Sequence, residues 1–301
     1  MSNQLILIRH GKSVWNKKNI YTGWVDVDLT DQGKIEAEKA GLLIKNQNIN
    51  IDFYYSSFQV RANHTLKIIQ KVLKSKKDFE RAWQLNERHY GELTGLNKIE
   101  TAKKIGEDKV FEFRRSWDIK PGKLSRESSY HPLNIETYEK IPKELIPDTE
   151  SLKDTYNRVL EYFKNEIQPK LINKNILITA HGNSIRALCK YLFNLDNDQI
   201  MSLEIPTGNP LVIKLSENLK IHECRYLDKE RSKEEHRIQI VNSLKWIGIE
   251  HDGDEYIQST KIEDHIKVAN ELLKNGNAYK CYCSSEEIEE QKKRARQKKL
   301  P

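Results

Sequence analysis

Residues 4–11 read Gln-Leu-Ile-Leu-Ile-Arg-His-Gly, and residues 175–182 read Asn-Ile-Leu-Ile-Thr-Ala-His-Gly. Each stretch is a short apolar run between polar residues, which is typical of a strand buried on both faces of a parallel sheet. Ligands of open α/β sheets bind beyond the carboxyl ends of the strands. If the two strands are neighbours, His10 and His181 would therefore face each other there. These stretches predict both the sheet and its functional edge.

Helical patterns separate these strands. Apolar residues recur at helical spacing over 31–45, with Thr30 as the predicted N-cap, and over 150–171. Further predicted elements are a strand at 52–56, a helix at about 59–73, a helix from His181 through Phe193, and strands at 211–215 and 220–227. The alternation predicts an α/β fold with a mostly parallel central sheet and helices on both faces. The segment 116–149 lacks periodicity and contains four prolines, which is typical of a functional cover or a mobile region.

The net charge of the chain indicates a kind of partner only when the part of the sequence that carries the charge is known. The 301 residues include 51 Lys and Arg against 44 Asp and Glu, a net charge of +7. Such an excess often indicates a nucleic-acid or membrane partner. Residues 228–301, however, carry 15 basic and 15 acidic side chains, so the whole excess lies in residues 1–227.

Other features of the sequence exclude several classes of protein. The longest apolar runs are strand-sized, far short of the ~20 residues that a membrane helix needs. No secretory signal is visible at the N-terminus. Four cysteines are too few for a disulfide framework in a chain of this length. We expect a cytoplasmic, reduced protein without a membrane partner.

The two His-Gly pairs predict phosphoryl chemistry. Glycine after histidine lets the backbone approach an anion, and a helix that begins after Asn183 would favour a phosphate at its N-terminus. A neutral imidazole nitrogen of His10 can attack phosphorus and form a phosphohistidine. The charge that develops on the transferring phosphoryl group needs several donors, and Arg9, Arg61 and His181 are the candidates.

Longer motifs extend this pattern over most of the chain. They are RHGKSVWN at 9–16, TGWVDVDL at 22–29, RANHTL at 61–66, LNERHYG at 85–91, GLNK at 95–98, RRSW at 114–117, AHGNS at 180–184 and PTG at 206–208. With these motifs, residues 4–227 resemble the cofactor-dependent phosphoglycerate mutase family of the histidine phosphatase superfamily. The NERHYG motif and the paired arginines distinguish this family from other histidine phosphatases. We therefore predict a mutase domain over residues 1–227.

The resemblance implies an isomerase of glycolysis and gluconeogenesis. Such an enzyme interconverts 3-phosphoglycerate and 2-phosphoglycerate through a phosphohistidine, with 2,3-bisphosphoglycerate as the priming phosphoryl donor and no metal. It would be a homodimer or a homotetramer. An alternative is a phosphatase of the same superfamily, or a mutase in which bisphosphoglycerate synthase or phosphatase activity dominates.

The resemblance also implies roles for individual residues. His10 would be the nucleophile, Glu87 the general acid and base, and His181 a group that stabilises the transition state. The residues implied to bind the phosphoryl group and the rest of the substrate are Arg9, Gly11, Lys12, Ser13, Asn16, Thr22, Gly23, Arg61, Arg88, His89, Tyr90, Lys98, Arg114, Arg115, Gly182 and Asn183. Lys12 replaces the Glu or Gln usual in the family, and we expect it to point to solvent. On charge pattern alone, Arg114 and Arg115 are more typical of a solvated face.

Residues 228–301 have a different character. Motifs at 228–233, 243–248, 256–259 and 278–283 resemble an internal stretch of glutamyl-tRNA synthetases. The His-Ile-Gly-His and Lys-Met-Ser-Lys-Ser signatures of those enzymes are absent, so we expect no aminoacylation. We interpret the segment as a fused fragment, non-functional and partly ordered, with helices at about 229–246 and 261–275.

Two binding functions of this fragment stay open as alternatives. Cys281 and Cys283 can supply half of a structural zinc site, which needs four ligands. The basic run at 292–299 can contact RNA phosphates, although such runs are more typical of a solvated helix end. Because the fragment has no net charge, we do not expect a nucleic-acid partner.

Overall fold

The computed structural model of the chain describes residues 3–216, 218–228 and 262–278. The chain divides into two compact units, Met1–Gln239 and Ile240–Pro301. In the second unit the described part contains helix α10 (Ile262–Lys274), which confirms the helix predicted at 261–275. The predicted helix at 229–246, the Cys281 and Cys283 pair and the basic run at 292–299 lie outside the described residues. The domain boundary after residue 227 stays a prediction.

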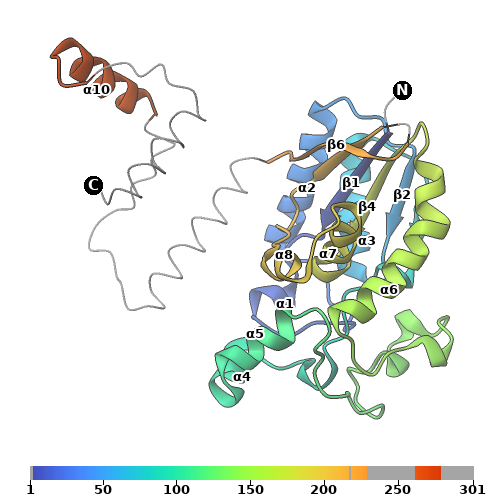
Figure 1. Cartoon of the computed structure of the whole chain (residues 1–301). Helices are drawn as coiled ribbons and strands as arrows, with labels where there is room; N and C mark the ends of the chain where they lie inside the picture. Colours follow the sequence, from blue (N-terminus) through green and yellow to red (C-terminus); the bar gives the residue numbers. More distant parts are fainter. Residues whose placement is uncertain (1–2, 217, 229–261, 279–301) are drawn as a thin grey trace. The chain divides into compact units, whose positions relative to one another are not determined.

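A six-stranded sheet forms the centre of the first unit, in the order β3-β2-β4-β1-β5-β6 (Figure 1). The strands are β1 (Asn3–Arg9), β2 (Phe53–Ser56), β3 (Glu80–Arg81), β4 (Asn175–Ala180), β5 (Leu211–Leu215) and β6 (Ile221–Tyr226). β1, β2, β3 and β4 are parallel, whereas β5 pairs antiparallel with β1 and β6 antiparallel with β5. The prediction of a mostly parallel sheet is confirmed.

The pairing of β1 with β4 sets the position of both histidines. The two strands are parallel neighbours with Arg9 opposite Ala180. One residue further, the backbone N–H of His10 donates to the carbonyl of Ala180 at 3.0 Å. His10 and His181 therefore leave the sheet side by side, as the sequence predicts.

Helices cover both faces of the sheet. They are α1 (Val14–Lys17), α2 (Asp31–Asn46), α3 (Val60–Leu73), α4 (Lys98–Ile105), α5 (Glu107–Arg115), α6 (Leu152–Tyr162), α7 (Gly182–Leu192) and α8 (Asn197–Ser202). Alternate residues of β1 point to opposite faces. Ile6 and Ile8 pack with residues of α2 and α3, and Leu5 and Leu7 pack with residues of α6 and α7 (Figure 1). α2 begins where predicted, with the Thr30 hydroxyl accepting the Gly33 N–H at 3.0 Å.

The helix predicted at 150–171 is shorter and less regular than expected. It begins at Leu152 because the Ser151 hydroxyl caps it, accepting the N–H of Asp154 at 3.1 Å. After Tyr162 the α-helix passes into a π-helical turn (Phe163–Ile167) and a 3-10 turn (Gln168–Leu171). Pro169 explains the change, because it has no N–H to donate and its ring crowds the preceding turn.

The apolar periodicity of the sequence does not predict the structure of the segment 116–149 or the short elements β3, α4, α5 and α8. The segment contains three short 3-10 helices, and its Tyr138, Ile141 and Ile146 pack against the buried Trp24. The four short elements were not predicted. α4 and α5 form a contacting pair away from the sheet (Figure 1). Among their apolar residues, Ile99 and Phe111 are exposed, so these helices give no strong apolar stripe.

Gly11 has a packing role that its sequence context does not reveal. A Cβ atom built on Gly11 would lie 2.1 Å from the carbonyl oxygen of Gly33 at the start of α2. A Cβ atom on Gly182 would instead lie 3.6 Å from Cζ of Arg9 and 3.8 Å from Oε2 of Glu87. Gly11 therefore makes room for backbone, whereas Gly182 keeps space open beside charged side chains.

We expect the substitution Gly11→Ala to lower the free energy of unfolding by about 1–3 kcal/mol, because backbone atoms must move to accept the methyl group. Gly182→Ala is the matched control. Its methyl group meets only ordinary contacts, so stability should change by less than about 0.5 kcal/mol. Urea unfolding followed by circular dichroism measures both values. Equal stability of the two variants would contradict the packing role of Gly11.

Candidate active site

His10 is held as a neutral imidazole with one free nitrogen. Its Nδ1 lies 2.7 Å from the carbonyl oxygen of Gly11, which can only accept, so Nδ1 carries the proton and donates it. Burial, together with the positive charges of Arg61 and Arg9, holds the pKa of His10 well below its usual value. The lone pair of Nε2 is therefore available at neutral pH, as nucleophilic attack requires.

His181 lies beside His10, with a distance of 5.0 Å between the ring centroids. Its Nε2 is 2.7 Å from the Ser57 hydroxyl, which already accepts the Gln59 N–H at 3.2 Å. Burial and Arg61 also lower the pKa of His181 well below its usual value, so this ring is neutral as well.

Glu87 is buried beside the two histidines, with one carboxylate oxygen fixed. Its Oε1 accepts hydrogen bonds from the Arg88 N–H at 2.8 Å, from the Asn183 N–H at 3.2 Å and from the Asn183 side-chain amide at 2.8 Å. The same amide contacts the Tyr90 hydroxyl at 3.0 Å. Because three donors converge on Oε1, the orientation of the carboxylate is set and Oε2 remains for proton transfer.

His10 and Glu87 border a cavity of about 110 Å³ with a strongly cationic wall. Six of the residues that line it are Lys or Arg, and two are Glu. Lys98 is the first residue of α4, and Arg114 and Arg115 are the last two of α5, so the paired short helices carry one side of the wall. A concave cationic surface of this kind raises the local concentration of anions.

Because these cations are crowded together, their pKa values are lowered. Burial, then the charge of Arg114, lowers the pKa of Lys98 to about 8 and that of Arg115 to about 10. Burial and Arg115 lower the pKa of Arg186 to about 9. A bound anion would relieve both the repulsion and part of the desolvation.

Most residues implied by the family resemblance line this cavity. They are Arg9, His10, Asn16, Thr22, Gly23, Arg61, Glu87, Tyr90, Lys98, Arg114, Arg115, Gly182 and Asn183. Ser13 is buried behind the wall, and its hydroxyl donates to Oδ1 of Asn16 at 2.9 Å. Arg88 donates from Nη2 to the carbonyls of Phe113 and Arg114 at 2.8 and 3.2 Å, which fixes the end of α5.

Four other implied residues do not line the cavity: Gly11, which packs against Gly33, His181, which lies beside His10, and Lys12 and His89. Lys12 is exposed to solvent, as expected. His89 is buried against Trp24, and its Nδ1 accepts the Gly91 N–H at 3.0 Å. Burial and the neighbouring His131 lower the pKa of His89 to about 3, so the ring is neutral. Direct contact of Lys12 or His89 with a ligand stays a prediction.

The sequence interpretation missed four residues of the site: Ser57, Arg186, Glu204 and Ile205. Ser57 directly follows β2, the other parallel neighbour of β4, so the rule that located the histidines would also have located it. Arg186 lies one helical turn after Asn183 and donates to its Oδ1 at 3.0 Å. Glu204 forms an ion pair with Arg115 at the cavity wall, and no sequence pattern indicates that pair.

Comparison with known proteins places this site in a family. The model described as "Histidine phosphatase superfamily (branch 1)" matches residues 5–134 and 122–221. A 2,3-bisphosphoglycerate-dependent phosphoglycerate mutase of Pelagibacter ubique (strain HTCC1062) is 65% identical over 231 residues, 76% of this chain and 97% of the relative. The chain belongs to the 2,3-bisphosphoglycerate-dependent phosphoglycerate mutase family. A member of the same name from Borreliella afzelii (strain PKo) is 48% identical and covers 75% of this chain and 92% of its own length.

More distant solved structures share the fold of this mutase family member. A mycobacterial glucosyl-3-phosphoglycerate phosphatase aligns with a TM-score of 0.54 at 19% identity, over 74% of this chain and 96% of its own. An alpha-ribazole phosphatase from Shigella flexneri aligns with a TM-score of 0.53 at 18% identity, over 73% of this chain and 94% of its own. At these identities the likeness concerns the fold alone.

Residues 226–301 match a different description, "tRNA synthetases class I (E and Q), catalytic domain". The resemblance of this segment to glutamyl-tRNA synthetases is thereby confirmed. Among the described residues, no helix is long and apolar enough to cross a membrane. Within the same residues, no group of three or more His, Cys, Asp or Glu side chains is arranged to hold a metal ion.

The lowered pKa of Lys98 predicts anion binding that weakens with rising pH. Lys98 is charged below pH 8 and loses its charge above it, so the affinity for sulfate, whose own charge is constant in this range, should fall between pH 7 and pH 9. The affinity for sulfate should fall tenfold at most between these pH values. This limit corresponds to about 1.4 kcal/mol, the free energy of one pKa unit. Isothermal titration calorimetry measures the affinity. Lys98→Arg should weaken this pH dependence without abolishing it, because Arg186 with its pKa of about 9 lines the same cavity, and a Lys98→Arg variant with the full wild-type fall would contradict the assignment.

The Glu204–Arg115 ion pair predicts competition between protein and ligand for one guanidinium. In Glu204→Gln the competing carboxylate is gone, so sulfate should bind about two- to fivefold more tightly, as expected for a partly exposed ion pair. Glu223→Gln is the matched control, because Glu223 pairs with Lys214 on the edge of the sheet. Unchanged sulfate affinity in Glu204→Gln would show that the pair does not compete.

Proposed function

We propose that this chain interconverts 3-phosphoglycerate and 2-phosphoglycerate, with His10 as the phosphorylated nucleophile. The observation that carries the proposal is the state of His10: a neutral ring, fixed through Nδ1, that borders a cavity lined by six cations and a buried carboxylate. Relatives up to 65% identical that bear the name of this activity support the substrate assignment. The pair of phosphoglycerates also suits a cavity whose charge requires small polyanions.

The donor set fits a molecule with two phosphates and a carboxylate. Among the described side chains, buried donors without a hydrogen-bond partner include Nε of Arg9 and Nε of Arg186, which line the cavity, and Nε and Nη1 of Arg88, whose guanidinium lies 4.7 Å from the ring of Tyr90. Native buried donors are normally satisfied, so unsatisfied donors around one cavity indicate a ligand with acceptor oxygens. When bound, 2,3-bisphosphoglycerate supplies the phosphoryl group that primes His10.

In the transfer step, the substrate hydroxyl oxygen attacks phosphorus as the bond from phosphorus to Nε2 of His10 breaks. Glu87 accepts the hydroxyl proton, and in the reverse direction it returns the proton to the leaving oxygen. Arg9, Asn16, Arg61, His181, Gly182 and Asn183 would hold the transferring group. Donors that are fixed before the reaction lower the barrier because they need no reorganisation as charge develops.

The remaining anionic groups of the substrate have their own cations. Ser13, Thr22, Gly23, Arg88, Tyr90, Lys98, Arg114 and Arg115 are proposed to bind the carboxylate and the phosphate that is not in transfer. Arginine suits this work because its planar fork presents two parallel donors to carboxylate or phosphate. This second set of cations favours a mutase over a phosphatase, because a mutase must retain the intermediate while it turns over.

Several properties are proposed on the family alone. We place the enzyme in the cytoplasm, as a homodimer or homotetramer. Residues 1–227 are proposed to be the catalytic domain, and residues 228–301 a fragment without catalytic function.

The decisive measurement is mutase activity with and without 2,3-bisphosphoglycerate. We expect activity to depend on this compound and to be unaffected by chelators. His10→Ala should lose at least about 10³-fold in kcat, because the nucleophile is removed. Activity that survives in His10→Ala, or that depends on manganese rather than on 2,3-bisphosphoglycerate, would overturn the proposal. Net release of inorganic phosphate from 3-phosphoglycerate would favour the phosphatase alternative.

A further inference from the structure

Glu87 lies in a segment without regular secondary structure. Residues 86–90 connect two 3-10 turns, Trp83–Leu85 and Gly91–Leu93, and belong to no strand or helix. The backbone groups of this segment therefore lack the hydrogen-bond ladder that would fix a strand. Something else must hold the backbone of Glu87 in place.

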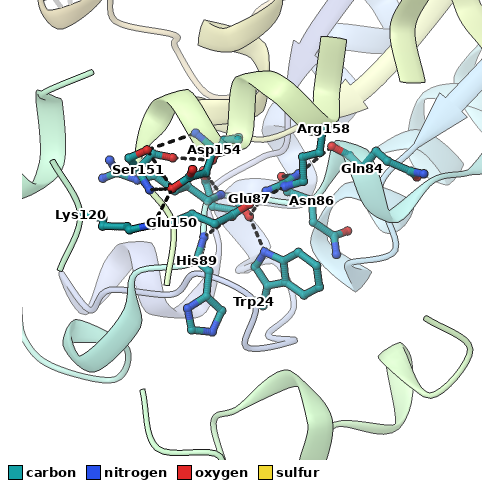
Figure 2. Close-up of polar contacts among 12 residues, drawn as sticks. Trp24, Gln84, Asn86, Glu87, His89, Lys120, Glu150, Ser151, Asp154 and Arg158 are labelled. Atoms are coloured by element: carbon teal, nitrogen blue, oxygen red, sulfur yellow. Dashed lines mark hydrogen bonds and ion pairs between the residues drawn. The ribbon is translucent and has the colours of Figure 1, made fainter. Parts of the chain in front are cut away.

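The side chain of Arg158 on α6 supplies that restraint. It donates to one backbone carbonyl of the preceding 3-10 turn, Nη1 to Gln84 at 2.6 Å, and to two of the segment, Nη1 to Asn86 at 3.0 Å and Nη2 to Glu87 at 3.0 Å. Figure 2 shows Arg158 extending to this backbone. Its planar guanidinium joins carbonyls of neighbouring residues in one rigid unit, which a lysine cannot do.

Glu150 fixes Arg158 in turn. Its carboxylate accepts Nε of Arg158 at 2.7 Å and Nη2 at 2.9 Å, with side chains that are only 4% and 9% exposed. Glu150 also exchanges two hydrogen bonds with the backbone of His89: Oε2 accepts the His89 N–H at 2.8 Å, and the Glu150 N–H donates to the His89 carbonyl at 3.0 Å (Figure 2). The Glu150–Arg158 ion pair thus holds the backbone of the segment on both sides of Glu87.

Two further contacts complete the restraint on Glu87 itself. The indole N–H of Trp24 donates to the Glu87 carbonyl at 2.6 Å (Figure 2). The Glu87 N–H donates to Oε1 of Gln59 at 3.0 Å. Both backbone polar groups of Glu87 are therefore held by side chains from other parts of the fold. A carboxylate that must reach a substrate hydroxyl gains from this, because small misplacements of a reacting group cost large factors in rate.

Arg158 and Glu150 do not line the cavity of His10. They line a separate cavity of about 600 Å³ with Trp83 and Gln84. Apart from the positive charge of Arg158, which contributes to the lowered pKa of His181, their effect on the reaction must therefore pass through the backbone that they hold.

We propose that Arg158, fixed by Glu150, is a positioning residue for the acid and base Glu87, an inference that rests on the function proposed for Glu87 above. Arg158 sets the position of the carboxylate without contact to the substrate. Its loss should impair steps that need proton transfer and spare steps that do not.

The test compares two reactions of His10 in the full-length protein. Mutase turnover needs proton transfer to or from a sugar-acid hydroxyl. Phosphorylation of His10 by p-nitrophenyl phosphate does not need proton transfer: Nε2 attacks phosphorus, the P–O bond breaks, and p-nitrophenolate leaves as a stable anion.

Arg158→Lys is the main variant, because it keeps a cation beside Glu150 and should therefore fold. Glu150→Gln is the second variant. Arg126→Gln is the matched control, since Arg126 pairs with Asp148 through Nε at 2.9 Å and its side chain donates to none of the carbonyls of this segment.

For Arg158→Lys we expect mutase kcat to fall about 10- to 100-fold with KM within about twofold of wild type, while the rate of the p-nitrophenolate burst, which reports phosphorylation of His10 before the phosphohistidine is hydrolysed, changes less than about threefold. Glu87→Gln, measured in parallel, should show the same selective loss at 10²- to 10⁴-fold. Glu150→Gln should lie between wild type and Arg158→Lys, and Arg126→Gln should match wild type.

Two results would overturn the positioning role while the function stands. One is wild-type mutase kcat in Arg158→Lys, and the other is an equal loss of both reactions, which indicates general damage to the site. Full mutase activity in Glu87→Gln would instead overturn the role of Glu87, and the positioning role with it. Thermal unfolding of each variant shows that the compared proteins are folded.

Discussion

The parallel pairing of β1 with β4 is the contact on which the rest of the site depends. It places Arg9 opposite Ala180 and lets the His10 N–H continue the ladder to the Ala180 carbonyl. On the other side of β1, the Gly208 N–H donates to the Arg9 carbonyl at 2.8 Å. The backbone at Arg9 and His10 is thus hydrogen-bonded on both sides. Because side chains alternate along a strand, a slip of one residue in this register would turn one histidine away from the other.

The arginines of the site donate hydrogen bonds to backbone carbonyls more often than to carboxylates. Arg61 donates to the carbonyls of Gly23 and Val25 at 2.9 Å, and Arg9 donates to that of Ile205 at 2.8 Å. Arg88 likewise holds carbonyls at the end of α5. Carbonyl oxygens satisfy the geometry of a guanidinium but carry no full charge. The side chains are therefore fixed while most of the positive charge remains available to a ligand.

The parts of this structure that could be predicted from sequence share a physical cause. Strands buried on both faces, such as β1 and β4, give uninterrupted apolar runs, and a histidine at the end of such a run is placed by topology alone. The motifs then implied most of the cavity lining. α4 and α5 could not be predicted in this way, because they bury little more than Thr101 and Val110. The contacts of Arg158 could not be predicted either, because it binds backbone carbonyls 71 to 74 residues away in the chain. No pattern of side chains in the sequence indicates such contacts.

The unpartnered donors of the cavity also bear on how long the protein persists in a cell. Each buried donor without an acceptor costs about 1–3 kcal/mol of folding free energy, and among the described residues that line the cavity Nε of Arg9 and Nε of Arg186 are such donors. A ligand that binds only the folded chain adds RT ln(1 + [L]/Kd) to stability, about 2.7 kcal/mol at a hundredfold excess over Kd. The metabolites turned over by the enzyme would thus protect it from proteolysis, so that its abundance follows the supply of its own substrates.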